Sequence, residues 1–266
     1  GSVIKNELGW EHILTYCEAI LRVYNLYGRR DNMYKARIKI LVKSLGIDAF
    51  KELVENEWQY IKNGPNTINT EELNRIGEFF SEPNYKKNIK SNLSDYIDEK
   101  AFGQWLSKCT NIHKKKGYRA VTFSLKETGR APGDASSSQM RAVADLSNEY
   151  SFGEIRVSHE QNLILADVQE DKLHDLWSKA KDHHLVTPNI GLLTDIICCP
   201  GGDFCSLANA KSIPIAQSIQ DLFDDMDYLH DIGHLNLNIS GCMNACGHHH
   251  VGHIGILGVD KDGSEW

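Results

Sequence analysis

The seven cysteines are unevenly placed, and five of them gather in two short segments of the second half of the chain. The first segment has the spacing Cys199-x5-Cys205, and the second has the spacing Cys242-x3-Cys246. Glycines stand beside these cysteines, at Gly201, Gly202, Gly241 and Gly247. In a chain without a secretory signal, clustered cysteines bind metal or carry out redox chemistry more often than they form disulfides. A fold that uses all four thiols must bring two distant loops together.

Four thiolates on two short turns match the requirement of a cubane iron–sulfur cluster. Glycines beside the ligands let the backbone wrap a bulky anionic cluster closely and offer N–H groups to its sulfurs. A tetrahedral zinc site could use the same four thiols, although C-x5-C is wider than the usual zinc spacing, and plain buried thiols are the third interpretation. Cys198 competes with Cys199 as a ligand, but only Cys199 gives the C-x5-C register.

The remaining cysteines and a histidine run call for simpler interpretations. Cys17 and Cys109 stand alone and are expected to fill the core or the surface. Four histidines also lie close together in the sequence: His248, His249, His250 and His253. Alternate side chains of an extended segment point to opposite sides, so three adjacent histidines cannot all face one ion. A surface or pocket-lining position is predicted for them.

Hydrophobic periodicity predicts helices in the first sixty residues and strands alternating with helices after residue 117. Helices are predicted at 11–27, 33–45, 48–61, 71–80, 99–109, 137–149, 170–183 and 206–229, the last broken or kinked at Pro214. Strands are predicted at 118–125, 192–198, 235–239 and 254–259, and as a pair within 153–168 that meets at 158–162. This order predicts an α+β fold, in which a helical segment is followed by a mixed, largely antiparallel sheet with helices on one face.

The same patterns divide the chain into three parts. Residues 1–63 are expected to form a helical segment, and residues 64–117, rich in Asn, Pro and Lys, a connector with short helices. Residues 118–266 are expected to form the domain that carries the cysteine loops. The chain starts at Gly1 without an initiator Met and stops at Trp266 just after an Asp-Gly turn, where a hairpin partner is expected. We therefore expect this chain to be a piece of a longer polypeptide that is located in the cytoplasm.

Charge is unevenly divided along the chain, whose formal net charge is −7. Residues 1–140 carry 22 Lys and Arg against 17 acidic residues, and residues 141–266 carry 7 against 19, so the two parts stand at +5 and −12. A phosphate backbone needs a basic footprint, so the acidic second part argues against nucleic-acid binding there. No run approaches the roughly 18 apolar residues of a membrane span. The basic residues between Arg29 and Lys43 are most simply a solvated face.

Several segments resemble one known family. Cys199-Pro-x4-Cys205-Ser-Leu-Ala, followed by Leu-Asn-Ile-Ser-Gly-Cys-Met-Asn-Ala-Cys-Gly at 237–247, resembles the paired motif of the sirohaem-dependent sulfite and nitrite reductases. Residues 19–32 and 35–39 are similar to the helical close of the first repeat in bacterial sulfite reductase haemoproteins. Residues 153–164 are similar to the strand pair near the start of the second repeat. The resemblance runs through most of the chain, and residues 118–266 correspond to a second repeat cut short at its C-terminus.

The resemblance implies a sirohaem beside a [4Fe-4S] cluster, with one thiolate shared between the cluster and the haem iron. The implied cluster ligands are Cys199, Cys205, Cys242 and Cys246. Of these, Cys246 is the implied bridging ligand to the haem, and Asn244 is expected near the haem. Arg156, Gln161 and Asn162 are candidates for contact with the cofactor, with a purely structural strand turn as the alternative.

The implied reaction is the six-electron reduction of sulfite to sulfide, with nitrite reduction to ammonia as the alternative. The expected electron donor is ferredoxin or a flavoprotein reductase subunit, and no nucleic acid or membrane is expected as a partner. Sirohaem and an oxyanion substrate both require cations, and in this family these lie chiefly upstream of the region that matches Gly1. No catalytic residue is therefore assigned, and this chain alone is expected to be inactive. A zinc-stabilised binding module without chemistry is the alternative from a different class.

Overall fold

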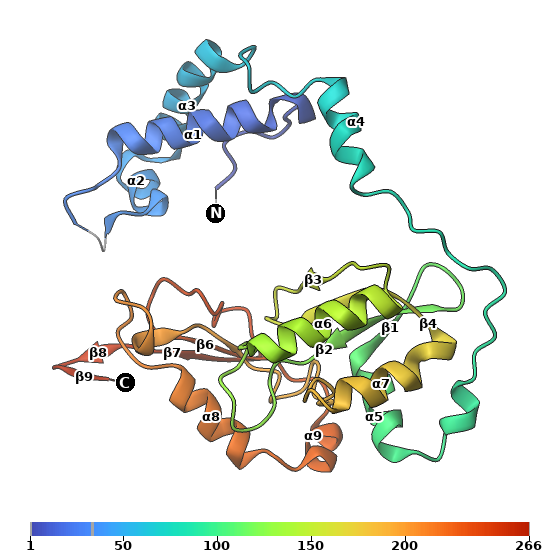
Figure 1. Ribbon diagram of the computed structural model, residues 1–266. Helices are drawn as coiled ribbons and strands as arrows, with labels where there is room; N and C mark the ends of the chain where they lie inside the picture. Colours follow the sequence, from blue (N-terminus) through green and yellow to red (C-terminus); the bar gives the residue numbers. More distant parts are fainter. Residues whose placement is uncertain (1, 33–34, 266) are drawn as a thin grey trace. The chain divides into compact units, whose positions relative to one another are not determined.

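The computed structural model describes residues 2–32 and 35–265, and the chain divides into two compact units, Gly1–Asn84 and Tyr85–Trp266. This division falls within the range expected to be a connector, and the two expected boundaries between the three parts stay predictions. Helices and strands follow the predicted order, so the predicted α+β class is confirmed (Figure 1). None of the helices in the described ranges is long and apolar enough to cross a membrane.

In the first unit, the described residues form helices and no strands. It contains η1 (Trp10–His12), α1 (Ile13–Tyr27), α2 (Ile38–Leu45), α3 (Ile47–Ile61) and α4 (Thr70–Glu78). The apolar faces of α1, α2 and α3 share one core, in which Val23, Leu41 and Val54 are buried. Trp58 of α3 also donates a hydrogen bond from Nε1 to Thr15 Oγ1 of α1 at 3.0 Å. The helix predicted at 33–45 begins at Ile38, and its predicted first residues, Met33 and Tyr34, lie outside the described residues.

The second unit begins with η3 (Leu93–Tyr96) and α5 (Lys100–Cys109), which lead into a four-stranded antiparallel sheet in the order β1-β2-β4-β3. Its strands are β1 (Thr110–Ile112), β2 (Tyr118–Phe123), β3 (Arg156–Val157) and β4 (Leu163–Gln169). The short strand β1 was not predicted, because its three residues lack the length and alternation of a recognisable strand. It nevertheless pairs with β2 over its whole length.

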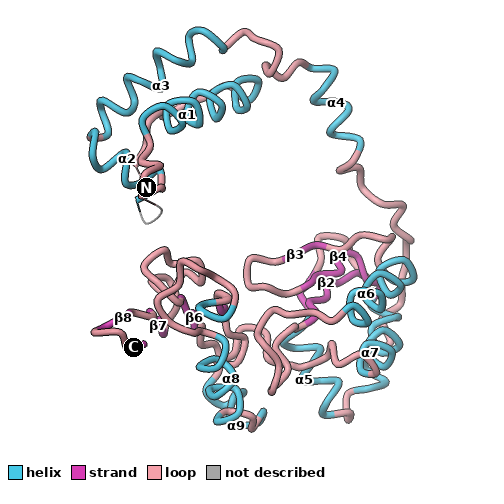
Figure 2. Tube along the Cα trace, turned by 60° about the vertical axis from the view of Figure 1, so that its left-hand side comes forward, coloured by secondary structure: helices cyan, strands magenta, loops and turns pink. Residues whose placement is uncertain are grey.

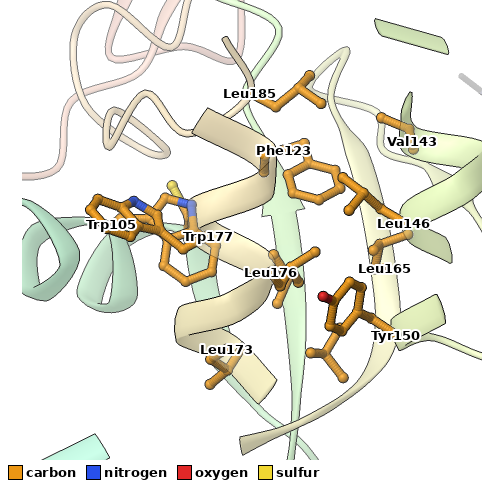
Figure 3. Close-up of a cluster of buried hydrophobic side chains, with 14 of the residues drawn as sticks. Trp105, Phe123, Val143, Leu146, Tyr150, Leu165, Leu173, Leu176, Trp177 and Leu185 are labelled. Atoms are coloured by element: carbon orange, nitrogen blue, oxygen red, sulfur yellow. The ribbon is translucent and has the colours of Figure 1, made fainter. Parts of the chain in front are cut away.

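Helices cover one face of this antiparallel sheet, as predicted. The helices are α5, α6 (Ser137–Tyr150) and α7 (Leu173–Lys181), the last preceded by η4 (Glu170–Lys172). Their apolar side chains share a core with alternate residues of β2 and β4, so Phe123 and Leu165 face Leu176 and Tyr150 (Figure 3). The core also holds Cys109, in agreement with its predicted filling role, while Cys17 is exposed.

The cysteine loops belong to a second, parallel sheet with the order β5-β6-β7. It consists of β5 (Ile197–Cys198), β6 (Leu237–Ser240) and β7 (Ile254–Leu257), and it packs on α8 (Ile213–Leu222) and α9 (Met226–Ile232). Figure 2 shows its strands apart from those of the antiparallel sheet. The predicted largely antiparallel sheet is therefore realised in the four-stranded part, while the strands that carry the cysteines run parallel.

Three sequence expectations in this second part are wrong in detail. The strand predicted at 192–198 is reduced to β5, because residues 189–195 form turns in which the Asp195 carboxylate accepts a hydrogen bond from Gly191 N at 2.9 Å. Pro214 does not break a helix but stands in the first turn of α8, where its missing N–H costs nothing. The expected hairpin partner is within the chain, since β8 (Asp260–Lys261) pairs with β9 (Ser264–Glu265) around the Asp-Gly turn.

A buried ion pair connects the antiparallel sheet to the segment that leads into β5. Lys126, just after β2, donates from Nζ to Asp195 Oδ1 at 2.5 Å and to the carbonyl oxygen of Glu160. Asn162 donates to the same Asp195 oxygen at 3.1 Å, and both charged side chains are almost fully buried. Burial lowers the pKa of Lys126, and the Asp195 carboxylate opposes this shift. The pair thus fixes the approach of β5 to the first sheet.

The first prediction concerns this ion pair. Lys126→Met leaves the buried Asp195 carboxylate without its cation, which should destabilise the second unit by about 3–5 kcal/mol. The double variant K126M/D195N should recover part of this loss, because a neutral amide is less costly to bury. Urea unfolding, together with hydrogen exchange of the β4 amides, measures the stability of both variants. A single variant as stable as the wild-type chain would contradict the role of the pair.

Candidate metal centre

Two adjacent parallel strands place the two cysteine loops at the same edge of the second sheet. β5 and β6 pair in the register Ile197 with Asn238 and Cys198 with Ile239. The pairing extends one residue further, because Cys199 N donates to the Ile239 carbonyl oxygen at 3.1 Å. Because parallel strands end at the same edge, Cys199 and Cys242 follow their strands into neighbouring loops.

The two loops approach so closely that their contact requires glycine. A Cβ atom added to Gly241 would lie 2.9 Å from Gly201 Cα and 2.7 Å from the Ala210 carbonyl oxygen, both too short for real carbon contacts. Gly201 itself has φ +59°, a left-handed conformation that glycine adopts without strain. Asn209 N and Ala210 N both donate to the Gly241 carbonyl oxygen, at 2.8 and 3.0 Å. Backbone contacts therefore join the first and second loops directly.

This contact also aims a backbone donor at one of the thiols. Gly241 N donates to Cys199 Sγ at 3.0 Å, and the Ser212 hydroxyl lies 3.5 Å from the same sulfur. Such donors stabilise negative charge on sulfur, as metal-bound thiolates require. Ser212 was not foreseen from the sequence, because no spacing motif links it to the cysteines.

The loop cysteines differ in exposure. Cys199 and Cys242 are each 8% exposed, Cys205 is half-buried and Cys246 is exposed. Within residues 2–32 and 35–265, no group of three or more His, Cys, Asp or Glu side chains converges on a position where they could hold a metal ion. The structure thus brings the two loops into contact, with two thiols inside the contact and Cys246 facing outward.

Cys198 and Cys199 point in different directions, as adjacent residues of a strand do. Cys198 is 3% exposed within the apolar core between the second sheet and its helices, and its Sγ donates to the Cys199 carbonyl oxygen at 3.2 Å. Burial, with smaller contributions from Cys199 and Asp134, raises the pKa of the Cys198 thiol to about 12. These observations favour Cys199 over Cys198 as the loop ligand.

The second cysteine loop folds back on β6. Ala245 N donates to the Cys242 carbonyl oxygen at 3.1 Å, and the buried Asn238 side chain donates to the Gly247 carbonyl oxygen at 3.0 Å. Ala245 has φ +58°, and the neighbouring Asn244 is half-buried. The turn that holds Asn244 between Cys242 and Cys246 is therefore tight and fixed by the strand beneath it.

The histidines lie at the surface and along a cavity, in agreement with the predicted position. The cavity measures about 660 Å³ and is lined on one side by Thr122 and Ile164 of the antiparallel sheet. On the other side it is lined by His248 and Gly252 of the segment between β6 and β7. It therefore runs between the two sheets of the second unit and reaches the segment that follows Cys246.

The three candidates for cofactor contact have other contacts in this structure. Gln161 exchanges two hydrogen bonds with the backbone of Cys198, donating to its carbonyl oxygen at 2.9 Å and accepting from its N–H at 3.0 Å. Asn162 is 1% exposed and bonds Leu125 N and Asp195. Arg156 pairs with Glu154 on an exposed surface. Their contact with a cofactor stays a prediction, while Gln161 plainly anchors the first cysteine strand.

Two family models match separate parts of the chain. Residues 2–62 match the "Nitrite and sulphite reductase 4Fe-4S domain", and residues 112–183 match the "Nitrite/Sulfite reductase ferredoxin-like half domain". The four loop cysteines lie outside both matched ranges, so their assignment rests on their spacing and on the geometry described above. The chain belongs to the family of nitrite and sulfite reductases.

The relatives that this chain matches include proteins named nitrite reductase and proteins named sulfite reductase. The chloroplastic ferredoxin–nitrite reductase of Betula pendula is 27% identical over 257 residues, covering 93% of this chain and 37% of that protein. Sulfite reductase [ferredoxin] 2 of Mycolicibacterium paratuberculosis is 26% identical over 253 residues, covering 93% and 39%. The NirA protein of Mycobacterium tuberculosis shares the fold with a TM-score of 0.62 at 23% identity, covering 99% of this chain and 43% of that one. The chain thus spans about two fifths of these proteins.

The cofactors of this family are a [4Fe-4S] cluster and sirohaem. Two features suit the cluster, namely the glycine contact that joins the cysteine loops and the Gly241 N–H directed at the Cys199 sulfur, while the four thiols do not converge among the described residues. For the haem, the outward-facing Cys246 offers an accessible thiol.

The second prediction tests the contact between the loops. Gly241→Ala forces a Cβ against Gly201 Cα and the Ala210 carbonyl oxygen, and overpacking of this kind should cost about 1–3 kcal/mol. Gly103→Ala on α5 is the matched control, because nothing lies within 4 Å of its added Cβ and the change should stabilise the helix. Thermal unfolding compares the two. Equal stability of both variants would contradict a required glycine contact.

The third prediction tests the anchor on the first cysteine strand. Gln161 has φ +61°, which Asn tolerates, so Gln161→Asn keeps the backbone turn while its shorter side chain loses both bonds to Cys198. Two lost hydrogen bonds of about 1 kcal/mol each should raise hydrogen exchange at Cys198 and Cys199 roughly tenfold or more. Gln217→Asn on α8 is the control. Unchanged exchange in Gln161→Asn would show that the anchor has no such role.

Proposed function

We propose that this chain is the cluster- and sirohaem-binding part of a reductase that converts sulfite to sulfide by six-electron reduction. The observation that carries the proposal is the joining of the Cys199 and Cys242 loops by the β5–β6 pair and by the contact of Gly201 with Gly241. Because the chain spans about two fifths of its relatives, the activity of the whole protein is part of the proposal.

The proposed cluster ligands are Cys199, Cys205, Cys242 and Cys246. When bound, the cluster and the sirohaem supply one-electron storage beside an iron that holds the oxyanion. Cys246 is the proposed bridging ligand, which its exposure supports, and Asn244 lies in the same tight turn. The Gly241 N–H donates to the Cys199 sulfur, as a donor to a metal-bound thiolate would, and Gln161 fixes the strand that delivers this cysteine.

Substrate-binding residues are not assigned within this chain. An oxyanion needs cationic donors on the open face of the haem, yet the second unit carries 18 Lys and Arg against 24 acidic residues, a net charge of −6. We propose that these donors lie in a region of the full-length protein that corresponds to the part of the relatives not covered by this chain. Little or no turnover is therefore expected from this chain alone.

Nitrite is the second candidate substrate. Several relatives carry the name ferredoxin–nitrite reductase, among them the Betula pendula protein, and the cysteine spacing does not separate the two oxyanions. Sulfide and ammonia production by a polypeptide of the relatives' full length, supplied with each oxyanion in turn, decides between them. A zinc-stabilised binding module is the competing non-enzymatic function, and a colourless protein with stoichiometric zinc would favour it.

The proposed electron donor is ferredoxin, which the names of the relatives support, with a flavoprotein reductase subunit as the alternative. A cytoplasmic location, without nucleic-acid or membrane partners, remains part of the proposal. The basic residues between Arg29 and Lys43, which the sequence predicts to be a solvated face, are a candidate docking face for an acidic donor. In the structure Arg29 pairs with Asp31 and Arg30 stacks on the Tyr24 ring, which engages two of these cations locally.

The fourth prediction distinguishes the proposed ligand Cys199 from its neighbour Cys198. Cys199→Ser should abolish most cluster binding, whereas Cys198→Ser, one residue away, should leave it largely intact because that thiol faces the core. Iron and acid-labile sulfide are measured after anaerobic reconstitution of the whole chain. The reverse result, with Cys198→Ser losing the cluster, would move the ligand assignment to Cys198.

A further inference from the structure

A buried serine beside the cysteine loops has a hydroxyl that neither its helix nor the solvent uses. Ser212 is 1% exposed, so its side chain is shut off from water. It stands at the N-cap of α8, where a serine usually accepts a hydrogen bond from the backbone of the first helical turn. Its side chain accepts no such bond, and Pro214, at the second helical position, has no N–H to donate. The hydroxyl is therefore available to another partner.

That partner is the sulfur of Cys199. Ser212 Oγ lies 3.5 Å from Cys199 Sγ, and both side chains are buried. In the part of the chain that the structure describes, the Ser212 side chain forms no other hydrogen bond. A thiol can donate to a hydroxyl or accept from it, but a sulfur that has lost its proton to bind metal can only accept. Once Cys199 is a ligand, the Ser212 hydroxyl is the donor.

Backbone contacts hold Ser212 in this place. The segment that leads into it is bonded to both cysteine loops, since the Ala210 carbonyl oxygen accepts from Gly202 N at 2.9 Å and Ala210 N donates to the Gly241 carbonyl oxygen at 3.0 Å. Two glycines also leave room for the hydroxyl, because a Cβ on Gly201 would lie 2.6 Å from Ser212 Oγ and one on Gly241 would lie 2.9 Å from it. The glycines that join the loops therefore also enclose the hydroxyl.

We propose that Ser212 is a positioning residue whose hydroxyl donates to the Cys199 sulfur and raises the reduction potential of the cluster, an inference that rests on the proposed function. Adding one electron to a cluster makes its ligand sulfurs more negative, so a hydrogen-bond donor stabilises the reduced form more than the oxidised form. The electron comes from the donor of the reductase, and the hydroxyl keeps its proton throughout. Ser212 acts through Cys199 and makes the cluster easier to reduce.

The fifth prediction removes this hydroxyl. At a fixed solution potential, Ser212→Ala should lower the ratio of reduced to oxidised cluster about five- to tenfold, because a hydrogen bond to a charged sulfur is lost. A tenfold change corresponds to about 59 mV for a one-electron couple. Ser212→Thr keeps the hydroxyl and should restore most of the wild-type ratio. The whole chain is reconstituted anaerobically with iron and sulfide, and electron paramagnetic resonance follows the reduced cluster during a dithionite titration.

The matched control is Ser147→Ala on α6. Ser147 is 2% exposed, and its hydroxyl donates to the Ala144 carbonyl oxygen at 2.8 Å, a bond that involves neither cysteine loop. This variant should keep the wild-type potential. Equal potentials in Ser212→Ala and the wild-type chain would overturn the proposal, and so would a shift of the same size in Ser147→Ala. A Ser212→Ala chain that loses the cluster altogether would show a merely structural role and would also overturn it.

Cluster uptake and cluster potential are measured separately. A wild-type chain that takes up neither iron nor acid-labile sulfide would contradict the proposed function and the role of Ser212 with it. A wild-type chain that holds the cluster at a potential independent of the Ser212 hydroxyl would contradict the role of Ser212 alone.

Discussion

The contact of Gly201 with Gly241 is the constraint on which the cysteine site depends. Any side chain at Gly241 would strike the first loop, and the same contact aims the Gly241 N–H at the Cys199 sulfur. The parallel pairing of β5 with β6 makes this contact possible, because it ends two strands side by side. Steric fit and electrostatic support of the thiol are therefore consequences of one backbone arrangement.

The charges of the second unit are organised around this arrangement. Lys126 and Asp195 neutralise each other in the interior and hold the approach to β5, while Gln161 grips the strand itself. The second unit as a whole is acidic, with 18 Lys and Arg against 24 acidic residues. An acidic unit is poorly suited to bind an oxyanion alone, which agrees with the proposal that substrate cations come from outside this chain.

The sequence predicted the helices, the α+β class and the two cysteine loops, because periodicity and spacing are local signals. It could not predict that β5 and β6 run parallel, since strand direction depends on where residues 199–236 travel between them. Lys126 and Ser212 were missed because their partners lie 69 and 13 residues away, and no motif marks either one. The reading of Pro214 failed because a proline in a first helical turn and one in a kink look alike in sequence.

The central claim is that the joined loops hold an iron–sulfur cluster whose Cys246 thiolate is shared with a haem iron. Mössbauer spectroscopy of the whole chain, reconstituted anaerobically with ⁵⁷Fe, sulfide and sirohaem, tests it most directly. The claim predicts cluster irons magnetically coupled to a haem iron, and substitution of Cys246 by Ser should remove the coupling. A chain that binds stoichiometric zinc and no iron, or a cluster and haem without coupling, would contradict it.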